Sequence, residues 1–223
     1  MRRANVVSHS SPVATQAPHA AGLGLAIKLR GDDAVVLTTI GEGSTSQGEW
    51  YEAVNWAATH KLPVIFMVEN NVYAISVRQD LQMAVEHVAE KAAGLGLPGV
   101  IVDGVDPVEV YRVVGEAAAR ARRGDGPTVI EAKVSRMTPH SSDDDDRSYR
   151  PRDEVEAMKA RDPLVLFRQR LLADKVLTEA QDAGLQGEVK VVIEAAVTEA
   201  ESAPYPAADE ASHPVYVEDV RRG

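Results

Sequence analysis

Residues 34–71, AVVLTTIGEGSTSQGEWYEAVNWAATHKLPVIFMVENN, decide the fold of this chain. Two apolar runs of strand length, 34–40 and 63–68, lie on either side of a stretch with helical character. A right-handed crossover between two such strands makes them parallel, so their carboxyl ends share one edge of the sheet. Gly41-Glu42-Gly43 follows the first run and Asn70-Asn71 follows the second. We therefore expect both groups at the edge where open α/β sheets bind ligands.

The Gly-Glu-Gly and Asn-Asn groups together predict the protein ligands of a cation site whose other ligands come from a diphosphate. Glu42 offers a carboxylate oxygen, Asn71 offers an amide oxygen, and the backbone carbonyl of Tyr73 could add a third. Mg²⁺ prefers a few protein oxygens together with phosphate oxygens, and the flanking Gly41 and Gly43 would let a diphosphate approach the backbone. The alternative is that Glu42 and Asn71 are only polar loop residues that end two strands.

The alternation of strands and helices continues along the chain. Further strands are predicted at 100–102 and 128–134, helices at 47–60, 80–93 and 107–123, and a loop at 70–77. Ser46 followed by Glu49 has the spacing of a capping box for the helix at 47–60. An Ala/Leu-rich helix over 19–29, with Gly31 at its end, precedes the first strand. The sequence thus predicts an α/β fold with a parallel sheet and flanking helices.

Three glycines, Gly94, Gly96 and Gly99, match the literal pattern GxGxxG. We reject a dinucleotide site there, because the glycines follow a predicted helix instead of a strand and Pro98 interrupts the pattern. Gly94 is better interpreted as the residue that follows the helix end.

The character of the chain changes after residue 136. Residues 137–151, MTPHSSDDDDRSYRP, are polar and are predicted to form a loop. Residues 152–223 are predicted to form a helical extension with an irregular tail from residue 203. Thr178 followed by Gln181 has capping-box spacing and marks the start of the last long helix.

Composition excludes several classes of protein and site. The net charge of −10 argues against nucleic acid as a partner, because phosphate contacts need clustered Lys and Arg. The absence of cysteine excludes disulfides, thiolate metal sites and a cysteine nucleophile. No apolar run approaches the roughly 20 residues that a membrane span needs, so no membrane partner is expected.

Two other segments each allow two interpretations. The hydroxyls and carbonyls of residues 10–16, SSPVATQ, could cap the helix that follows, which the residues alone favour, or could bind a cation or a cofactor. His140 could be a solvated loop residue, or an active-site acid or hydrogen-bond donor, since the pKa of histidine lies near neutrality. The run Asp143–Asp146 lacks the glycine and distal glutamate of a calcium loop and is interpreted as solvated.

Taken together, five stretches resemble a known family. SSPVATQ (10–16), GEGSTSQG (41–48), ENNVYAIS (69–76), VDGVD (102–106) and HSSDDDDRSYR (140–150) occur in the order typical of the α subunit of the thiamine-diphosphate-dependent 2-oxo acid dehydrogenase component. The branched-chain form is the most similar, and the pyruvate form comes after it. The resemblance implies a thiamine-diphosphate-binding fold in residues 1–136, an active-site loop at 137–151 and a helical extension at 152–223.

The resemblance also implies a role for individual residues. Mg²⁺ would be held by Glu42, Asn71 and the Tyr73 carbonyl. Thiamine diphosphate would contact Ser11, Val13, Gly41, Glu42, Gly43, Ser44, Asn71 and His140. A monovalent cation such as K⁺ would be held by Ser10, Pro12, Thr15 and Gln16. His140 would be the catalytic residue of the loop, and Ser141 corresponds to a position that is phosphorylated in mitochondrial members, a control not expected in a bacterial chain.

The implied reaction is oxidative decarboxylation of a branched-chain 2-oxo acid of the 3-methyl-2-oxobutanoate type, with acyl transfer to a lipoyl group. The implied partners are a β subunit in an α2β2 heterotetramer and a lipoyl-bearing acyltransferase. We expect a cytoplasmic bacterial protein, with the mitochondrial matrix as the alternative. The other functional alternatives are a pyruvate dehydrogenase α subunit, a transketolase-like carboligase, and a non-catalytic assembly partner.

Two departures from the family pattern are relevant to the alternative of a non-catalytic assembly partner. Such subunits carry a long segment ahead of SSPVATQ, with the first strand and helices of the fold and an arginine that grips the diphosphate, so we expect this chain to be an N-terminally truncated form. Glu69 also stands where a family member places an arginine near the diphosphate.

Overall fold

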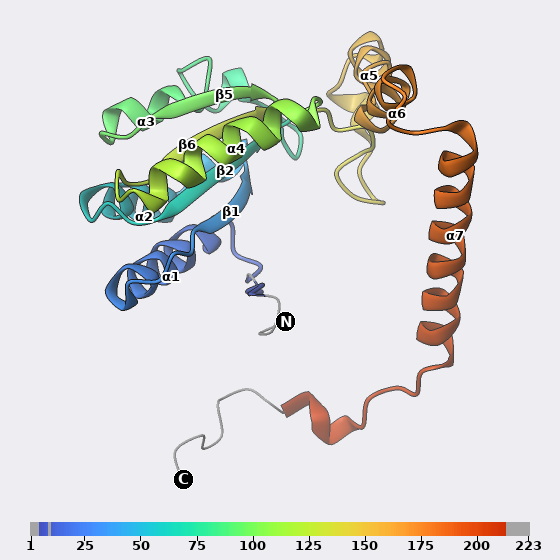
Figure 1. Cartoon of the computed structure of the whole chain (residues 1–223), viewed down its shortest axis with the longest axis horizontal. Coiled ribbons are helices and arrows are strands. Elements are labelled where there is room, and N and C mark those ends of the chain that lie inside the picture. The colour runs from blue at the N-terminus through green and yellow to red at the C-terminus, as the bar shows by residue number, and fades with distance from the viewer. Residues whose placement is uncertain (1–4, 9, 213–223) are drawn as a thin grey trace. The chain divides into compact units, whose positions relative to one another are not determined.

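The computed structural model describes residues 5–8 and 10–212 of the chain (Figure 1). The chain divides into two compact units, residues 1–168 and 169–223. The predicted boundary between 151 and 152 lies inside the first unit.

The first unit is built on a four-stranded parallel sheet in the order β1-β2-β6-β5. The strands are β1 (Val36–Gly41), β2 (Val64–Asn70), β5 (Gly99–Asp103) and β6 (Thr128–Lys133). The register pairs Gly41 with Glu69, and Asn70 with Lys133. The predicted parallel α/β sheet is confirmed, and Glu42 and Asn71 leave neighbouring strands at the same edge.

Helices cover both faces of this sheet (Figure 1). α1 (Gln16–Arg30) and α2 (Gly48–Thr59) pack on the face that carries Phe66, and α4 (Pro107–Arg122) packs on the face that carries Met67. Successive side chains of a strand point to opposite faces, so the continuous apolar run of β2 fills two core clusters at once. Full burial of a side chain such as Phe66 contributes about 1.5–3 kcal/mol to folding.

Local signals set one end of each of two helices, and the end of α1 is the one that was predicted. α1 ends at Gly31, whose φ of 70° suits glycine and lets its N–H donate to the carbonyls of Ile27 and Lys28. The Asp106 carboxylate caps α4 by accepting the N–H groups of Val108 and Glu109.

The capping box predicted at Ser46 was wrong. Ser46 ends a 3₁₀ turn, η2 (Glu42–Ser46), and the N-cap of α2 is Gln47, whose side chain makes no capping bond. The Ser46 hydroxyl instead accepts a hydrogen bond from Gln82 Nε2 at 3.0 Å. A tertiary contact has therefore taken the hydroxyl that the local pattern assigned to the helix.

The segment after β2 also differs from the prediction. The expected loop contains a short antiparallel hairpin, β3 (Tyr73–Ala74) and β4 (Val77–Arg78). The expected helix at 80–93 is reduced to a 3₁₀ turn, η3 (Gln79–Leu81), and a short helix, α3 (Glu90–Gly94). Gly94 is the last residue of α3 and not the residue beyond its end; Gly96, with a φ of 75°, takes the left-handed conformation instead.

Most of the described residues beyond residue 145 lie in helical segments. A 3₁₀ turn, η4 (Asp146–Ser148), and α5 (Arg152–Lys159) belong to the first unit, and α6 (Pro163–Ala173) runs across the division. The second unit contains α7 (Glu179–Ser202) and the turn η5 (Ala208–Ser212). The capping box of Thr178 and Gln181 is confirmed. The predicted irregular tail lies partly outside the described residues.

None of the helices within the described residues has the length and apolar character that crossing a membrane requires.

Candidate functional site

Glu42 is the central residue of the site, at the carboxyl end of β1. Its side chain is buried, with 1% of its surface exposed. Oε2 accepts the Asn71 backbone N–H at 3.3 Å, but Oε1 is buried without a hydrogen-bond donor among the described residues. Burial raises the pKa of Glu42, and the backbone N–H groups that face it only partly oppose this effect. A buried carboxylate with one free oxygen has the chemistry of a cation ligand.

Asn71 belongs to a tight turn that faces Glu42. Its Oδ1 accepts the backbone N–H of Tyr73 at 3.1 Å, which leaves a second lone pair on that oxygen. Between them, Val72 has a φ of 74°, which is a strained conformation for a β-branched residue. Such strain persists only where the surroundings hold it, and it is common at binding sites.

Gly43 allows the two turns to approach. A Cβ atom at this position would lie 2.6 Å from Ala74 Cβ, so only glycine fits beneath the hairpin. Ser44 lies half-buried in the same 3₁₀ turn, and its carbonyl accepts the N–H of Gln47. The structure therefore brings the predicted residues Gly41, Glu42, Gly43, Ser44, Asn71 and Tyr73 to one edge of the sheet.

A buried polar network supports this edge from below. The carboxylate of Glu131 accepts hydrogen bonds from Asn70 Nδ2 at 2.6 Å, from the Ala89 N–H at 2.9 Å and from Lys133 Nζ. Burial alone would raise the pKa of Glu131, but these donors outweigh it and the pKa is lowered. Glu131 is therefore a buried anion that is fully paired, in contrast to Glu42.

The segment Ser10–Gln16 lies beside the end of β1. Gln16 Nε2 donates to the Thr39 carbonyl at 3.2 Å. Ser10 Oγ and Thr15 Oγ1 lie 2.6 Å apart, and Thr15 Oγ1 donates to the Pro12 carbonyl at 3.0 Å. Thr15 is the N-cap of α1 but makes no capping bond with its side chain. The capping interpretation fails for Thr15, and its hydroxyl joins two other oxygens of the predicted cation site.

The two predicted cofactor contacts in that segment, Ser11 and Val13, are both exposed. No hydrogen bond within the described part of the chain joins either of them to Glu42 or Asn71.

The loop at 137–151 is attached to the hairpin through aromatic and guanidinium groups. Arg136 donates to the Ile75 carbonyl and to the Tyr149 hydroxyl, both at 2.8 Å. Its guanidinium also lies over the Tyr73 ring, 5.6 Å from the centroid. The Tyr149 hydroxyl donates to Asp144, whose carboxylate also accepts the His140 backbone N–H at 2.8 Å. His140 itself is exposed.

Asp144 and Arg150 complete the attachment of the loop. The hydrogen bond from Tyr149 and then the His140 N–H lower the pKa of Asp144, which therefore accepts as a carboxylate. The buried Arg150 side chain pairs with Asp146 at 3.0 Å and donates to the Arg136 carbonyl at 2.9 Å. The main chain of His140 is thus tied to the hairpin, while its side chain makes no hydrogen bond to Glu42 or Asn71 among the described residues.

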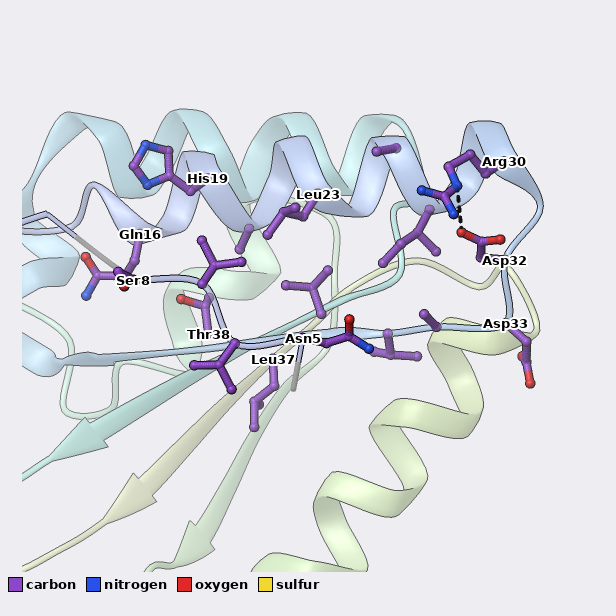
Figure 2. A pocket seen from close by; sticks show the side chains of 18 residues that line it. Asn5, Ser8, Gln16, His19, Leu23, Arg30, Asp32, Asp33, Leu37 and Thr38 are labelled. Carbon is purple, nitrogen blue, oxygen red and sulfur yellow. Dashed lines mark ion pairs between the residues drawn. The ribbon is translucent and has the colours of Figure 1, made fainter. Parts of the chain in front are cut away.

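A separate groove of about 770 Å³ runs along α1, β1 and residues 5–8 (Figure 2). Gln16 and His19 lie at one end and the Arg30–Asp32 ion pair, at 2.9 Å, lies at the other. Neither Glu42 nor Asn71 lines it. The groove follows the edge strand of the sheet, and the chemistry of the candidate site lies elsewhere.

Sequence reasoning missed several residues that shape the site. Arg136, Gln79 and Gln82 carry no local signal, because their partners lie 61, 9 and 39 residues away in the chain. Glu131 did carry one, since it is a single acidic residue inside an apolar strand, TVIEAK. Within the described residues, no three His, Cys, Asp or Glu side chains form a group that could hold a metal ion.

Comparison with known proteins adds the following findings. A sequence profile of the family described as "Dehydrogenase E1 component" matches residues 1–209. The chain is 49% identical, over 96% of its length, to the 2-oxoisovalerate dehydrogenase subunit alpha of Bacillus subtilis. It is 41% identical, over 89% of its length, to the pyruvate dehydrogenase E1 component subunit alpha of Staphylococcus aureus. The chain spans 65% of the first relative and 54% of the second.

Proposed function

The chain belongs to the dehydrogenase E1 component family, and from that premise we propose that it serves as an α subunit that binds thiamine diphosphate through Mg²⁺ in the oxidative decarboxylation of a 2-oxo acid. The observation that carries this proposal is the buried, undonated Oε1 of Glu42 beside Asn71. An uncompensated buried carboxylate is costly, and a divalent cation would offset that cost.

The donor set fits Mg²⁺ carrying a diphosphate. Glu42 Oε1, Asn71 Oδ1 and the Tyr73 carbonyl would supply protein oxygens, and phosphate oxygens and water would complete the shell. Gly43 and Ser44, in the turn beneath the hairpin, would lie against the diphosphate. Ser10, Pro12, Thr15 and Gln16 would hold a monovalent cation such as K⁺ that keeps the neighbouring Ser11 and Val13 in place for the cofactor.

When bound, thiamine diphosphate supplies a nucleophilic carbon and an electron sink for decarboxylation of a 2-oxo acid. The residues of this chain bind and orient that group. A cation facing Glu42 would favour its ionised form, which burial alone disfavours because it raises the pKa of this carboxyl. His140, held through its main chain by Asp144, would place an exposed imidazole as a hydrogen-bond donor or acid toward the substrate.

We propose a branched-chain 2-oxo acid of the 3-methyl-2-oxobutanoate type as substrate, with pyruvate as the alternative. The higher identity to the 2-oxoisovalerate relative supports this order. The word "subunit" in both relatives' names supports a β-subunit partner, and the proposed acyl acceptor is a lipoyl-bearing acyltransferase. We propose a location in the bacterial cytoplasm, and the bacterial sources of both relatives support the bacterial part of that proposal.

The test is calorimetric titration of thiamine diphosphate with Mg²⁺ into the chain mixed with its β subunit. Saturable binding that needs Mg²⁺, followed by decarboxylation of 3-methyl-2-oxobutanoate faster than of pyruvate, is the expected result. Absence of binding at millimolar cofactor would overturn the catalytic proposal and would favour a non-catalytic assembly role. Faster turnover of pyruvate would reverse the substrate order only.

A further inference from the structure

The two halves of the candidate cation site have little direct connection. The turn Glu42–Ser46 and the turn Asn70–Tyr73 share one hydrogen bond among the described residues, from the Asn71 N–H to Glu42 Oε2 at 3.3 Å. A bond of that length is weak. The pairing of Gly41 with Glu69 places the two backbones side by side, and further contacts orient the turns that carry Glu42 and Asn71.

Gln82 holds the first of these turns. Its Nε2 donates to the Gly43 carbonyl at 2.9 Å and to Ser46 Oγ at 3.0 Å. Both acceptors belong to the 3₁₀ turn that begins with Glu42. The opposite amide orientation would place Oε1 against the Gly43 carbonyl oxygen, so the contacts define which way the amide points.

Gln79 holds the second turn, Asn70–Tyr73, through contacts on both sides of Val72, the residue with the strained φ. Its backbone N–H donates to the Val72 carbonyl at 2.8 Å, and its side-chain Oε1 accepts Asn70 Nδ2 at 2.7 Å. Asn70 Oδ1 in turn accepts the Val72 N–H at 2.9 Å. The unfavourable φ of Val72 is thus held from both sides, and the direction of the neighbouring Asn71 is held with it.

Gln79 and Gln82 lie three residues apart, around the single 3₁₀ turn η3. That turn is also tied within itself, because the N–H groups of Gln82 and Met83 both donate to the Gln79 carbonyl at 3.0 Å. The backbones of the two glutamines are therefore linked directly through this turn. We propose that this pair, the glutamine bracket, is a positioning device that sets the spacing of Glu42 and Asn71 for a small divalent cation; the inference rests on the proposed cofactor site.

The glutamine bracket should affect the preference of the site for a small cation over a larger one. Mg²⁺ demands near-ideal octahedral geometry with short bonds, whereas Ca²⁺ accepts longer bonds and a flexible shell. Loosening the bracket should therefore penalise Mg²⁺ more than Ca²⁺. Removal of a residue that orients a metal ligand typically costs about 10–100-fold in metal affinity.

The test uses the full chain with Gln82→Met, which keeps the side-chain length and removes both hydrogen bonds. Gln79→Met is the second variant. Gln186→Met is the matched control, since Gln186 lies exposed on α7 and bonds only Asp182 through its side chain among the described contacts. The first readout is hydrogen exchange of the Asn71 amide in the free chain. The second is the concentration of Mg²⁺ or Ca²⁺ that half-saturates thiamine diphosphate binding in the complex with the β subunit.

We expect hydrogen exchange of the Asn71 amide to become about tenfold faster in either bracket variant. Exchange of the β6 amides in these variants, and of the Asn71 amide in the Gln186→Met control, should stay unchanged. We expect the Mg²⁺ requirement to rise about tenfold and the Ca²⁺ requirement to rise far less. Unchanged Asn71 protection, or an equal rise for both cations, would overturn the bracket. If the wild-type complex binds no cofactor, the proposed function fails, and the exchange experiment still decides the bracket by itself.

Discussion

The backbone N–H of Asn71 donates to Glu42 Oε2 across 3.3 Å, while Oε1 of the same carboxylate is buried without a donor among the described residues. One oxygen of Glu42 is therefore satisfied by the chain and the other is available to a ligand. This asymmetry has consequences for stability and for binding.

Glu42→Gln should stabilise the cation-free chain at neutral pH by about 1–3 kcal/mol, because it removes a buried charge that is incompletely satisfied. Folding raises the pKa of Glu42 above its ordinary value of 4.5, so the folded chain holds this proton at a higher pH than the unfolded chain does. The free energy of unfolding of the wild type therefore falls as the pH rises from 4.5 through the folded-state pKa. The advantage of the variant should therefore shrink as the pH falls toward 4.5. Urea unfolding at several pH values measures it, and an advantage that grows on acidification would contradict this account.

Asn71→Ala should weaken Mg²⁺-dependent binding of thiamine diphosphate by about 10–100-fold, because it removes a proposed ligand oxygen and the cap on the Tyr73 N–H. Asn55→Ala is the matched control, since Asn55 is exposed on α2 and no hydrogen bond of its side chain to a described residue is found. Calorimetric titration compares the two variants. Equal affinity in both would remove Asn71 from the metal site.

The position of Glu42 and Asn71 at one edge of the sheet could be predicted because it depends only on the order of neighbouring strands and helices along the chain. An apolar strand, a helix and a second apolar strand give parallel strands whose carboxyl ends coincide. The same reasoning predicted that α1 ends at Gly31, where one residue decides the conformation.

The rest of the site depends on partners that are distant in sequence. Glu131 joins Ala89 and Asn70 across separations of 42 and 61 residues, and no local pattern encodes such pairs. The predicted helix at 80–93 failed for the same reason: Gln79 and Gln82 bond to neighbouring turns, and the Ala89 N–H donates to Glu131. Ser46 likewise bonds Gln82 and does not cap α2.

Gly43→Ala should destabilise the first unit by about 1–3 kcal/mol, because the new methyl group would lie 2.6 Å from Ala74 Cβ and the hairpin would have to move. Gly41→Ala is the matched control, since its φ is −74° and no atom lies within 4 Å of an added Cβ. It should change stability by about 0.5 kcal/mol or less. Thermal unfolding of both variants distinguishes them, and equal losses would show that the hairpin yields without strain.

Glu131→Ala should cost about 3–5 kcal/mol, because it leaves buried donors of Asn70 and Ala89 without an acceptor. The lowered pKa means that Glu131 contributes stability above its ordinary value of 4.5, and this contribution is lost as the pH falls through the folded-state pKa. The deficit of the variant relative to wild type should accordingly narrow in acid. The control is Glu188→Ala on α7, whose exposed side chain should cost less than about 0.5 kcal/mol. A Glu131 variant as stable as that control would refute the network.

Tyr149→Phe should release the loop at 137–151 from the hairpin. The hydroxyl of Tyr149 accepts from Arg136 at 2.8 Å and donates to Asp144, so its loss removes the connection between Arg136 and the carboxylate that holds the His140 N–H. The local cost is about 0.5–1.5 kcal/mol for each lost hydrogen bond. Limited trypsin digestion measures the release, because the Arg147 side chain is 81% exposed and offers a cleavage site in that loop.

Cleavage after Arg147 should become several-fold faster in Tyr149→Phe, in proportion to the population of the open loop. Tyr111→Phe is the control, since Tyr111 is 82% exposed on α4 and should leave the rate unchanged. Turnover with a 2-oxo acid should fall more than cofactor affinity, because the change acts on the position of His140 and leaves Glu42 and Asn71 in place. A wild-type cleavage rate would show that the ring contacts of Arg136 with Tyr73 hold the loop without the hydroxyl.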